Sequence, residues 1–320
     1  TSTVTSDQIS KLPLENVSSA VNLQAGVVEG HFRGGRSNEV KYLIDGISVN
    51  DVFSGNFSLE AEINTVQEIQ VLSGTFNAEY GEALSGVVNQ VTKIARDNYS
   101  GSFSFYTGDY LSSGTKLFKN IDHISRSDLQ NYEGSLSGPV PWTGNFMKFF
   151  LSGRYYYDDG YIYGRRVFNP SDSSNFSDND PLKWHIGATG DGKYVPMNFQ
   201  KRYSLQGKIS FDVGDSKGLI LQGIYQDKQF KEYDHQFQLN PDGDYLRFQK
   251  SFLGMASYNH VFSNASFIEF NASTFISEYK QYVYENPLDP RYVNPERMRD
   301  VGGSAFLTGG TQNWHFFHRT

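Results

Sequence analysis

The most regular feature of this chain is an alternation of apolar and polar residues that recurs in several segments after residue 98. In residues 203–213, the side chains Tyr, Leu, Gly, Ile, Phe and Val alternate with Ser, Gln, Lys, Ser and Asp. A period of two predicts a β-strand with one apolar and one polar face. The pattern is also clear in residues 149–157 and 268–276. It is less regular in four further segments: 101–110, 131–138, 219–229 and 250–262. The later part of the chain is therefore predicted to consist of about seven strands.

The links between these predicted strands alternate in length. Short links at 139–145, 214–217 and 263–264 alternate with long ones at 111–128, 158–200, 230–249 and from 281 onward. Barrels of the bacterial outer membrane alternate short periplasmic turns with long extracellular loops, whereas a soluble sandwich has no reason to do so. We therefore predict an antiparallel transmembrane β-barrel. About seven strands and the start of another would leave unpaired edges in hydrocarbon, so we expect further strands outside this sequence.

The first 97 residues have a different pattern, which predicts short helices and short strands. Ser6 is a suitable N-cap for a helix over 7–12 that Pro13 ends, and a second helix is predicted over 17–24. Strands are predicted over three segments: 39–44, 68–72 and 86–92. These elements indicate a small mixed α/β domain over residues 1–97, followed by the first part of the barrel over residues 98–320.

The composition agrees with a strand-rich envelope protein. The chain has 21 Tyr, 25 Phe and 31 Gly, which suits strands bordered by aromatic side chains better than a Leu-rich soluble core. It has no Cys, which excludes disulfides, thiolate nucleophiles and Cys-ligated metals. The net charge of −7 is spread over both signs without a basic stripe, so nucleic acid is not an expected partner. A mean hydropathy of −0.51 is compatible with a barrel, because lipid-facing and lumen-facing residues alternate.

Several short motifs stand in a fixed order in the first hundred residues. An Arg-Gly pair at Arg33 is followed by a strand that ends in Leu-Ile-Asp-Gly at residues 43–46. Residues 66–71 then lead into a segment with several glycines and into Ser-Gly-Val-Val-Asn-Gln-Val-Thr-Lys at 85–93. This order resembles the plug domain of TonB-dependent outer-membrane receptors. The residues that carry the resemblance are Arg33, Gly34, Asp45, Gly46, Gly74, Tyr80, Gly81 and Gly86.

The resemblance implies a mixed α/β plug inside a transmembrane antiparallel β-barrel of about 22 strands, of which about seven to eight lie in this sequence. It also implies a location in the outer membrane of a Gram-negative bacterium. Sequence segments such as Arg-Gly-Gly-Arg-Ser-Asn-Glu-Val are similar to segments of large receptors of this family from Bacteroidota. Glycine allows the tight turns that such a plug needs, although each glycine alone is typical of any β-rich domain.

The resemblance places two plug loops, 35–38 and 50–57, on the external side where a ligand arrives. The residues expected to face the ligand are Arg36, Ser37, Asn38, Asp51, Phe53, Asn56 and Phe57. Packing of these loops against the barrel wall is the alternative. Arg33 and Arg36 are also candidates for ion pairs with lumen carboxylates such as Glu133, with solvated loop charges as the alternative.

Three other patterns suggest cofactors only superficially. Residues 187–193 read Gly-x-x-x-x-Gly-Lys, but Tyr194 stands where a phosphate-binding loop needs a Ser or Thr hydroxyl. His315 and His318 lack a third metal ligand, so loop packing is favoured for them. The spacing of Asp172, Asp178 and Asp180 fits no standard calcium-binding loop. We therefore expect no metal, no cofactor and no catalytic centre.

The predicted function is import, in which the plug and the extracellular loops capture an external ligand and the TonB complex remodels the plug. The segment that contacts TonB is expected upstream of residue 1. The expected partners are outer-membrane lipid, the TonB complex, and a surface lipoprotein or other outer-membrane proteins. A second function stays open, that of a structural or interaction subunit in an outer-membrane secretion or protein-insertion complex. The cargo stays open among glycans, peptides, siderophores and metal complexes.

Overall fold

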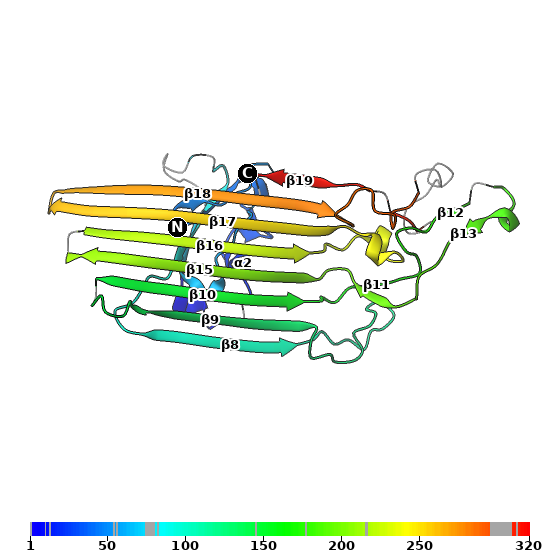
Figure 1. The fold of residues 1–320 in the computed structure, drawn as a ribbon, viewed down its shortest axis with the longest axis horizontal. Coiled ribbons are helices and arrows are strands. Elements are labelled where there is room, and N and C mark those ends of the chain that lie inside the picture. Colours follow the sequence, from blue (N-terminus) through cyan, green and yellow to red (C-terminus); the bar gives the residue numbers. More distant parts are fainter. Residues whose placement is uncertain are drawn as a thin grey trace.

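The computed structural model describes all residues except 1, 10, 13, 54, 56, 74–80, 82, 145, 177, 215–216, 295–308 and 312. A small N-terminal domain lies against one face of a large sheet whose strands run side by side along the molecule (Figure 1). Among the described helices, none combines the length and the apolar character required to span a membrane.

The N-terminal domain is built on a five-stranded sheet with the order β1, β6, β7, β4, β5. Its strands are β1 (Ser2–Thr5), β4 (Val40–Ile44), β5 (Ile47–Ser48), β6 (Val66–Ser73) and β7 (Gly86–Thr92). Strands β4 and β7 are parallel, and the other neighbours are antiparallel. The three strands predicted from the sequence are confirmed as β4, β6 and β7. The four residues of β1 are too few to show a period, which is why pattern alone did not predict it.

Two short helices, α1 (Ser6–Ile9) and α2 (Val17–Asn22), pack beside β6. Both end earlier than predicted. Asn16 caps α2, because its side-chain oxygen accepts a hydrogen bond from Ser19 N at 2.8 Å. The other short elements of this domain are β2 (Val27–Val28), β3 (His31–Phe32), η1 (Ser37–Glu39) and η2 (Ile63–Thr65).

The large sheet has eight antiparallel strands in the order β19, β18, β17, β16, β15, β10, β9, β8. Its strands are β8 (Ser100–Gly108), β9 (Leu129–Pro139), β10 (Met147–Asp158), β15 (Gln200–Val213), β16 (Lys217–Phe230), β17 (Leu246–Ser263), β18 (Ser266–Tyr282) and β19 (Phe316–Arg319). All seven predicted strands are confirmed, and β19 is the eighth. Strands that follow one another in this list are neighbours in space, as in an up-and-down barrel wall.

The links of the large sheet sort by length as predicted. The strand ends that the short links join lie at the left-hand end of Figure 1, and the described parts of the long loops lie at the right-hand end. The long loops contain these small elements: β11 (Tyr163–Arg165), β12 (Ser174–Asn175), η3 (Pro181–Lys183), β13 (His185–Ile186), β14 (Tyr194–Pro196), η5 (His235–Phe237) and η6 (Pro241–Gly243). Strand β11 pairs with β14, and β12 pairs with β13.

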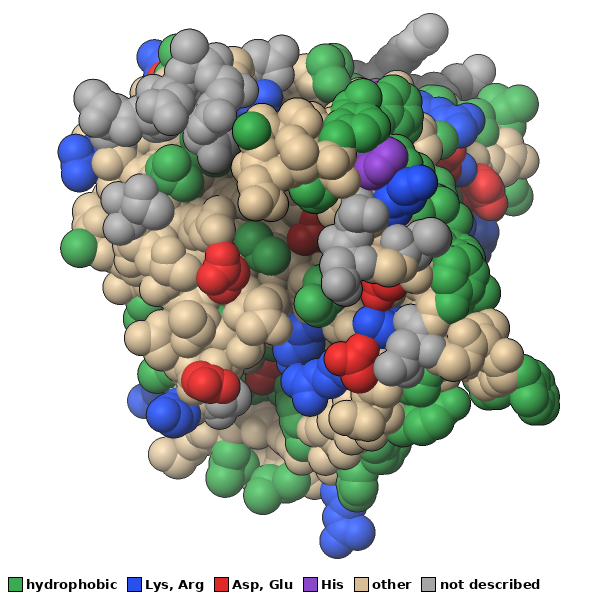
Figure 2. Space-filling view, turned by 90° about the vertical axis from the view of Figure 1, so that its left-hand side faces the viewer, with side chains coloured by type: hydrophobic (Ala, Val, Ile, Leu, Met, Phe, Trp, Pro, Cys, Tyr) green, Lys and Arg blue, Asp and Glu red, His purple; other side chains and the backbone are tan. Residues whose placement is uncertain are grey.

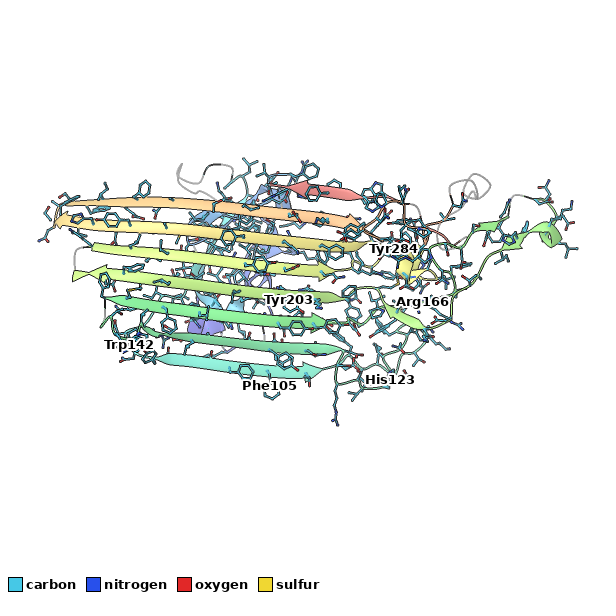
Figure 3. All side chains as sticks on the ribbon, in the orientation of Figure 1. Phe105, His123, Trp142, Arg166, Tyr203 and Tyr284 are labelled. Carbon is cyan, nitrogen blue, oxygen red and sulfur yellow. The ribbon has the colours of Figure 1, made fainter. Side chains whose placement is uncertain are left out.

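The two faces of the large sheet have opposite character. We call the face against the N-terminal domain the inner face and the opposite one the outer face. On β15, the inner residue Lys208 is 4% exposed, whereas the outer residue Leu205 is 53% exposed. Hydrophobic side chains gather along the right-hand edge of Figure 2, where the outer face lies, and Tyr203 and Phe105 are outer-face residues in Figure 3. Apolar residues predicted for one face of the strands therefore lie on the outer face.

Candidate functional site between the N-terminal domain and the sheet

Buried ion pairs fasten the N-terminal domain to the inner face of the sheet. Glu62, just before η2, accepts hydrogen bonds from Arg154 Nη1 on β10 at 2.8 Å and from Arg202 Nη2 on β15 at 3.3 Å. Ser204 Oγ donates to the same carboxylate at 2.5 Å. The three charged side chains are at most 8% exposed. Because removing one partner would leave a buried charge uncompensated, this pairing is costly to break.

Two further carboxylates of the N-terminal domain extend this cluster. Arg154 donates to the Glu15 carbonyl at 3.0 Å and to the Glu15 carboxylate at 3.2 Å. Glu60 accepts a hydrogen bond from Ser18 N at 2.8 Å and lies 4.0 Å from Arg202. Two segments of the domain that are distant in sequence therefore share the same pair of arginines.

The two central carboxylates differ in their electrostatics. Burial alone would raise the pKa of Glu62, but Arg202 and Arg154 outweigh burial, so its pKa lies below its ordinary value. Burial raises the pKa of Glu60, and Arg202 offsets only part of that effect. Glu62 is thus the ionised partner of the arginines, while Glu60 takes up a proton more readily.

The Asp-Gly turn singled out in the sequence forms a second anchor. Asp45 and Gly46 have φ angles of 47° and 83° and join β4 to β5 as a two-residue hairpin turn. The Asp45 carboxylate accepts hydrogen bonds from Thr92 N at 2.8 Å and Thr92 Oγ1 at 2.5 Å. Lys208 Nζ lies 3.4 Å from the same carboxylate. The turn therefore holds a carboxylate against a buried lysine of the sheet.

The Arg-Gly pair also forms a two-residue turn, which follows β3. Arg33 and Gly34 have φ angles of 48° and 83°, and Gly35 N donates to Phe32 O at 2.8 Å across the turn. Phe32 also explains a second glycine, because a Cβ at Gly86 would lie only 2.6 Å from the Phe32 ring. These motif residues shape the backbone of the domain.

The remaining motif residues lie in or beside a segment that is mostly undescribed. Gly81 is exposed, and its carbonyl accepts a hydrogen bond from Lys41 Nζ at 2.7 Å. Gly74 and Tyr80 lie outside the described residues.

Of the two alternatives for Arg33 and Arg36, the structure agrees with exposed loop charges rather than with ion pairs to the sheet. Arg33 and Arg36 are exposed, and within the described ranges neither forms an ion pair with the sheet. Glu133 lies 3.7 Å from Arg154, a residue of its own sheet. The polarity is reversed, because the domain supplies carboxylates and the sheet supplies cations. Arg154 and Lys208 fall on the polar face of the predicted strands, and that position was the signal for this arrangement.

At the loop end of this interface, the domain and the sheet share a pocket of about 570 Å³. Asp51 Oδ2 lies 2.6 Å from His318 Nε2 on β19, and the two side chains are 4% and 14% exposed. The Phe53 ring stacks on the His318 ring, with centroids 4.9 Å apart. Lys228 brings an ammonium group to the lining, and other lining residues are Tyr279, Trp314 and Phe316. Three residues predicted to face a ligand, Asp51, Phe53 and Phe57, line this pocket.

Two other described residues that were predicted to face a ligand lie away from this pocket. Arg36 and Asn38 are exposed and do not line it. Ser37 begins η1, and nothing is described of its side chain; Asn56 lies outside the described residues. The pocket therefore involves the second predicted loop, 50–57, rather than the first.

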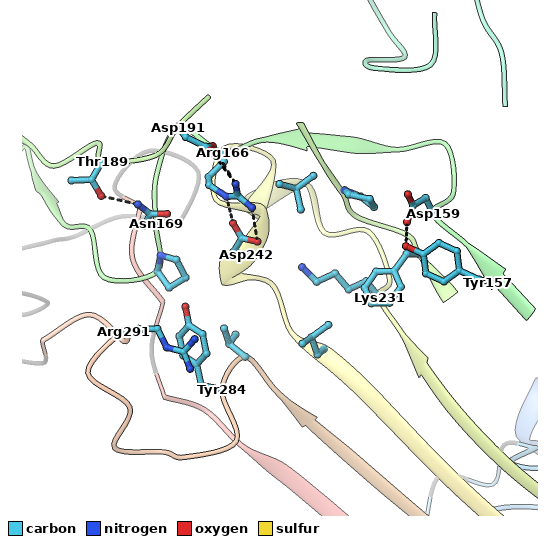
Figure 4. Close-up of a pocket in the computed structure, with 16 residues that line it drawn as sticks. Tyr157, Asp159, Arg166, Asn169, Thr189, Asp191, Lys231, Asp242, Tyr284 and Arg291 are labelled. Atoms are coloured by element: carbon cyan, nitrogen blue, oxygen red, sulfur yellow. Dashed lines mark hydrogen bonds and ion pairs between the residues drawn. The ribbon is translucent and has the colours of Figure 1, made fainter. Parts of the chain in front are cut away.

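A larger pocket of about 760 Å³ lies among the long loops and strand ends (Figure 4). Arg166 is held between Asp191, at 3.1 Å, and Asp242. The Arg291 guanidinium lies 3.9 Å above the centre of the Tyr284 ring. These contacts connect one long loop to the next and give the pocket a lining with charges of both signs.

The patterns that resembled cofactor motifs have structural contacts. Asp172 is buried and accepts hydrogen bonds from Thr189 N at 2.8 Å and Thr189 Oγ1 at 2.6 Å. Residues 187–193 lead into β14 without the helix that a phosphate-binding loop requires. His315 Nε2 lies 2.7 Å from the Tyr284 carbonyl. Within the part of the chain that the structure describes, no three His, Asp or Glu side chains are grouped to hold a metal ion.

Residues 1–88 match the family described as TonB-dependent Receptor Plug Domain. These residues are the plug domain of a TonB-dependent receptor. The chain is 29% identical over 113 residues to the TonB-dependent transporter Oar of Myxococcus xanthus, in an alignment that covers 33% of this chain and 11% of Oar. It is 25% identical over 271 residues to the probable TonB-dependent siderophore receptor PirA of Acinetobacter baumannii, which covers 76% of this chain and 31% of that protein. The chain thus spans less than a third of the length of either relative.

Solved structures show the same fold. The siderophore receptor PirA of Pseudomonas aeruginosa superposes with a TM-score of 0.59 at 18% identity, covering 88% of this chain and 40% of that one. The outer membrane transporter YddB of Escherichia coli gives a TM-score of 0.57 at 15% identity, covering 88% and 39%. The large sheet is therefore part of a barrel wall around the plug. TonB-dependent receptors are outer-membrane proteins of Gram-negative bacteria, and this receptor is assigned to that membrane.

Proposed function

We propose that this receptor imports an external ligand through a barrel that its plug closes, and that the TonB complex supplies the force that moves the plug. One observation carries the proposal. The plug is fastened to the wall at the Glu62 cluster, and the same plug shares the Asp51–His318 pocket with the wall at the loop end. A ligand that rearranges the pocket and a force that breaks the cluster therefore act on one body.

The pocket also suggests a class of ligand. Its aromatic lining favours a molecule with flat apolar faces, and Asp51, Lys228 and His318 supply hydrogen-bonding and charged groups at its edge. Two of the similar proteins are named as siderophore receptors, and ferric siderophores with aromatic groups are one such class. We further infer that the plug ends near residue 97, because β7 ends at Thr92 and β8 begins at Ser100.

The test measures which compounds disappear from the culture medium, so no ligand has to be chosen in advance. Culture supernatants of cells with the complete receptor, without it, and with the receptor but without TonB are compared by mass spectrometry. We expect at least one compound to be depleted only when receptor and TonB are both present, and Phe53→Ala to slow that depletion. The absence of receptor-dependent depletion contradicts import and favours a scaffold. Receptor-dependent depletion that persists without TonB contradicts the proposed role of the TonB complex.

A further inference from the structure

Three glycines face one another across the outer face of the barrel wall. Gly207 on β15 pairs with Gly223 on β16, and Gly223 pairs with Gly254 on β17. The row continues to Thr274 on β18. Strands lie about 4.8 Å apart, so this row of small residues is about 14 Å long. It lies well inside the wall, with further strands on both sides.

Larger apolar side chains border this row on both sides. Leu205, Tyr225 and Phe252 are paired with one another on the side toward the loops, while Ile209 and Leu221 are paired on the opposite side. All five side chains are between 39% and 53% exposed on the outer face. Together they enclose a groove of about 550 Å³. We call it the glycine groove.

The chain itself does not require two of these three glycines, whereas a Cβ at Gly254 would lie 3.3 Å from Phe252 and Thr274. A Cβ at Gly207 would have its nearest contact at 4.0 Å, and a Cβ at Gly223 at 3.9 Å, so both positions have room for a side chain. Neither glycine has a positive φ, and the pairing of β15 with β16 and of β16 with β17 shows no register shift. Glycine inside a strand weakens it, and one reason for its presence is the close approach of another molecule.

Charged residues lie on the same face, nearer the loops. Lys250 on β17 is paired across strands with Asp227 and Glu278, and Glu278 is paired with Arg319. Lys250 Nζ lies 3.4 Å from Asp227 and is half-exposed. In the next row, Lys201 and Lys280 also face outward. Four cations and two carboxylates therefore border the apolar band and leave a positive excess there.

The same level of the wall carries a ladder of aromatic rings. Phe105, Tyr132, Tyr155 and Tyr203 stand side by side on four adjacent strands, and the last two have ring centroids 5.0 Å apart. Aromatic rings of barrel walls gather where hydrocarbon gives way to headgroups. The cations thus lie at headgroup level, and the glycine groove lies in the hydrocarbon beneath them.

We propose that the glycine groove holds an acyl chain of one anionic membrane lipid, whose phosphate lies beside Lys250. A protein strand fits less well, because the backbone groups of β15, β16 and β17 are already paired with strands on both sides and offer no hydrogen bonds to a peptide. A transmembrane helix rich in small residues is the competing occupant. The proposal does not depend on whether the receptor imports a ligand.

The test uses the complete receptor, reconstituted in mixed phosphatidylcholine and phosphatidylglycerol vesicles, extracted in mild detergent and weighed intact by native mass spectrometry. We expect retained phosphatidylglycerol in the wild type and roughly tenfold less in Gly223→Leu, since the leucine occupies the space of several methylenes. Gly153→Leu is the matched control, because Gly153 also faces outward with its nearest Cβ contact at 3.8 Å but does not line the groove.

A second variant separates the headgroup from the tail. Lys250→Gln is expected to reduce the preference for phosphatidylglycerol over phosphatidylcholine while some lipid is still retained. Heat-modifiable mobility on gels verifies that each variant is folded. Equal lipid retention in wild type, Gly223→Leu and Gly153→Leu overturns the proposal. So does a result in which Gly223→Leu releases a copurified membrane protein and leaves lipid retention unchanged.

Discussion

The inner and outer faces of β15 are made from alternating residues of one strand, yet they follow opposite rules. Inward, Arg202 and Lys208 are buried and hold plug carboxylates. Outward, Tyr203, Leu205 and Gly207 form apolar surface without a contact to the plug. The inward-facing residues, which are every second residue of the strand, therefore make the specific contacts with the plug. A shift of one residue in register would exchange the two faces, which explains why the strand pairing must be strictly defined.

The largest expected effect is on the inner face. Glu62→Gln removes the buried carboxylate that Arg154 and Arg202 share and is expected to destabilise plug docking by about 3–5 kcal/mol. The measurement is a urea titration of the complete receptor, with hydrogen exchange of plug amides as the readout. Glu133→Gln is the control, because it removes a carboxylate 3.7 Å from Arg154 that belongs to the wall. Equal losses in both variants would show that the plug-to-wall pair has no special role.

A matched pair on β16 compares the faces directly. Leu221 points outward and is 40% exposed, whereas its neighbour Ile220 points inward and is half-buried. Leu221→Lys is expected to cost about 2–4 kcal/mol if it lies near the bilayer midplane, because an ammonium is placed in hydrocarbon, and Ile220→Lys about 1 kcal/mol or less. The measurement is the free energy of folding into lipid vesicles. Similar costs for the two substitutions would contradict the assignment of the faces.

The smallest expected effect is a contrast in pH dependence between plug and loop. Burial raises the pKa of Asp244 to about 6, with Lys231 opposing it, whereas Arg202 and Arg154 outweigh burial and lower the pKa of Glu62. A free carboxyl titrates near about 4, so folding of the loop takes up a proton and loses stability as pH rises from about 4 to about 6. Plug docking behaves oppositely and weakens as pH falls below the ordinary Glu range.

Hydrogen-exchange protection at several pH values checks this contrast. Protection around 241–244 is expected to fall between pH about 4 and about 6 in the wild type and to stay level in Asp244→Asn. Plug amides are expected to lose protection as the pH falls below about 4, and Glu62→Gln to remove that loss. Parallel changes in plug and loop would be inconsistent with the opposite shifts of the two carboxyls.

Local chemistry explains which parts of the fold were predictable from the sequence. The wall strands show a period of two, and their links sort by length, so both were predicted with nearly correct bounds. The Asp45–Gly46 turn was recognisable because Asp and Gly both tolerate a positive φ. The Arg33–Gly34 pair was identified only through the resemblance, because Arg does not favour a positive φ. Each of these features is contained within a few neighbouring residues.

Contacts between distant residues account for most of what was missed. Strand β1 exists because Ser2–Thr5 pairs with β6, far along the chain. Asp51 was a candidate and His318 was expected to pack in a loop, but 267 positions separate them and no pattern links the two. The polarity of the plug-to-wall ion pairs was reversed for the same reason, since a charge alone does not identify its partner.

The first strand of the plug has a mechanical consequence. Strand β1 is joined to β6 by four residue pairs, from Ser2 with Val71 to Thr5 with Glu68. Tension applied through the backbone at Ser2 reaches this short ribbon before the rest of the plug. A pull across the strands peels the pairs one after another, whereas a pull along them loads all four together. The direction of the pull thus decides how much force is needed before the remaining plug yields.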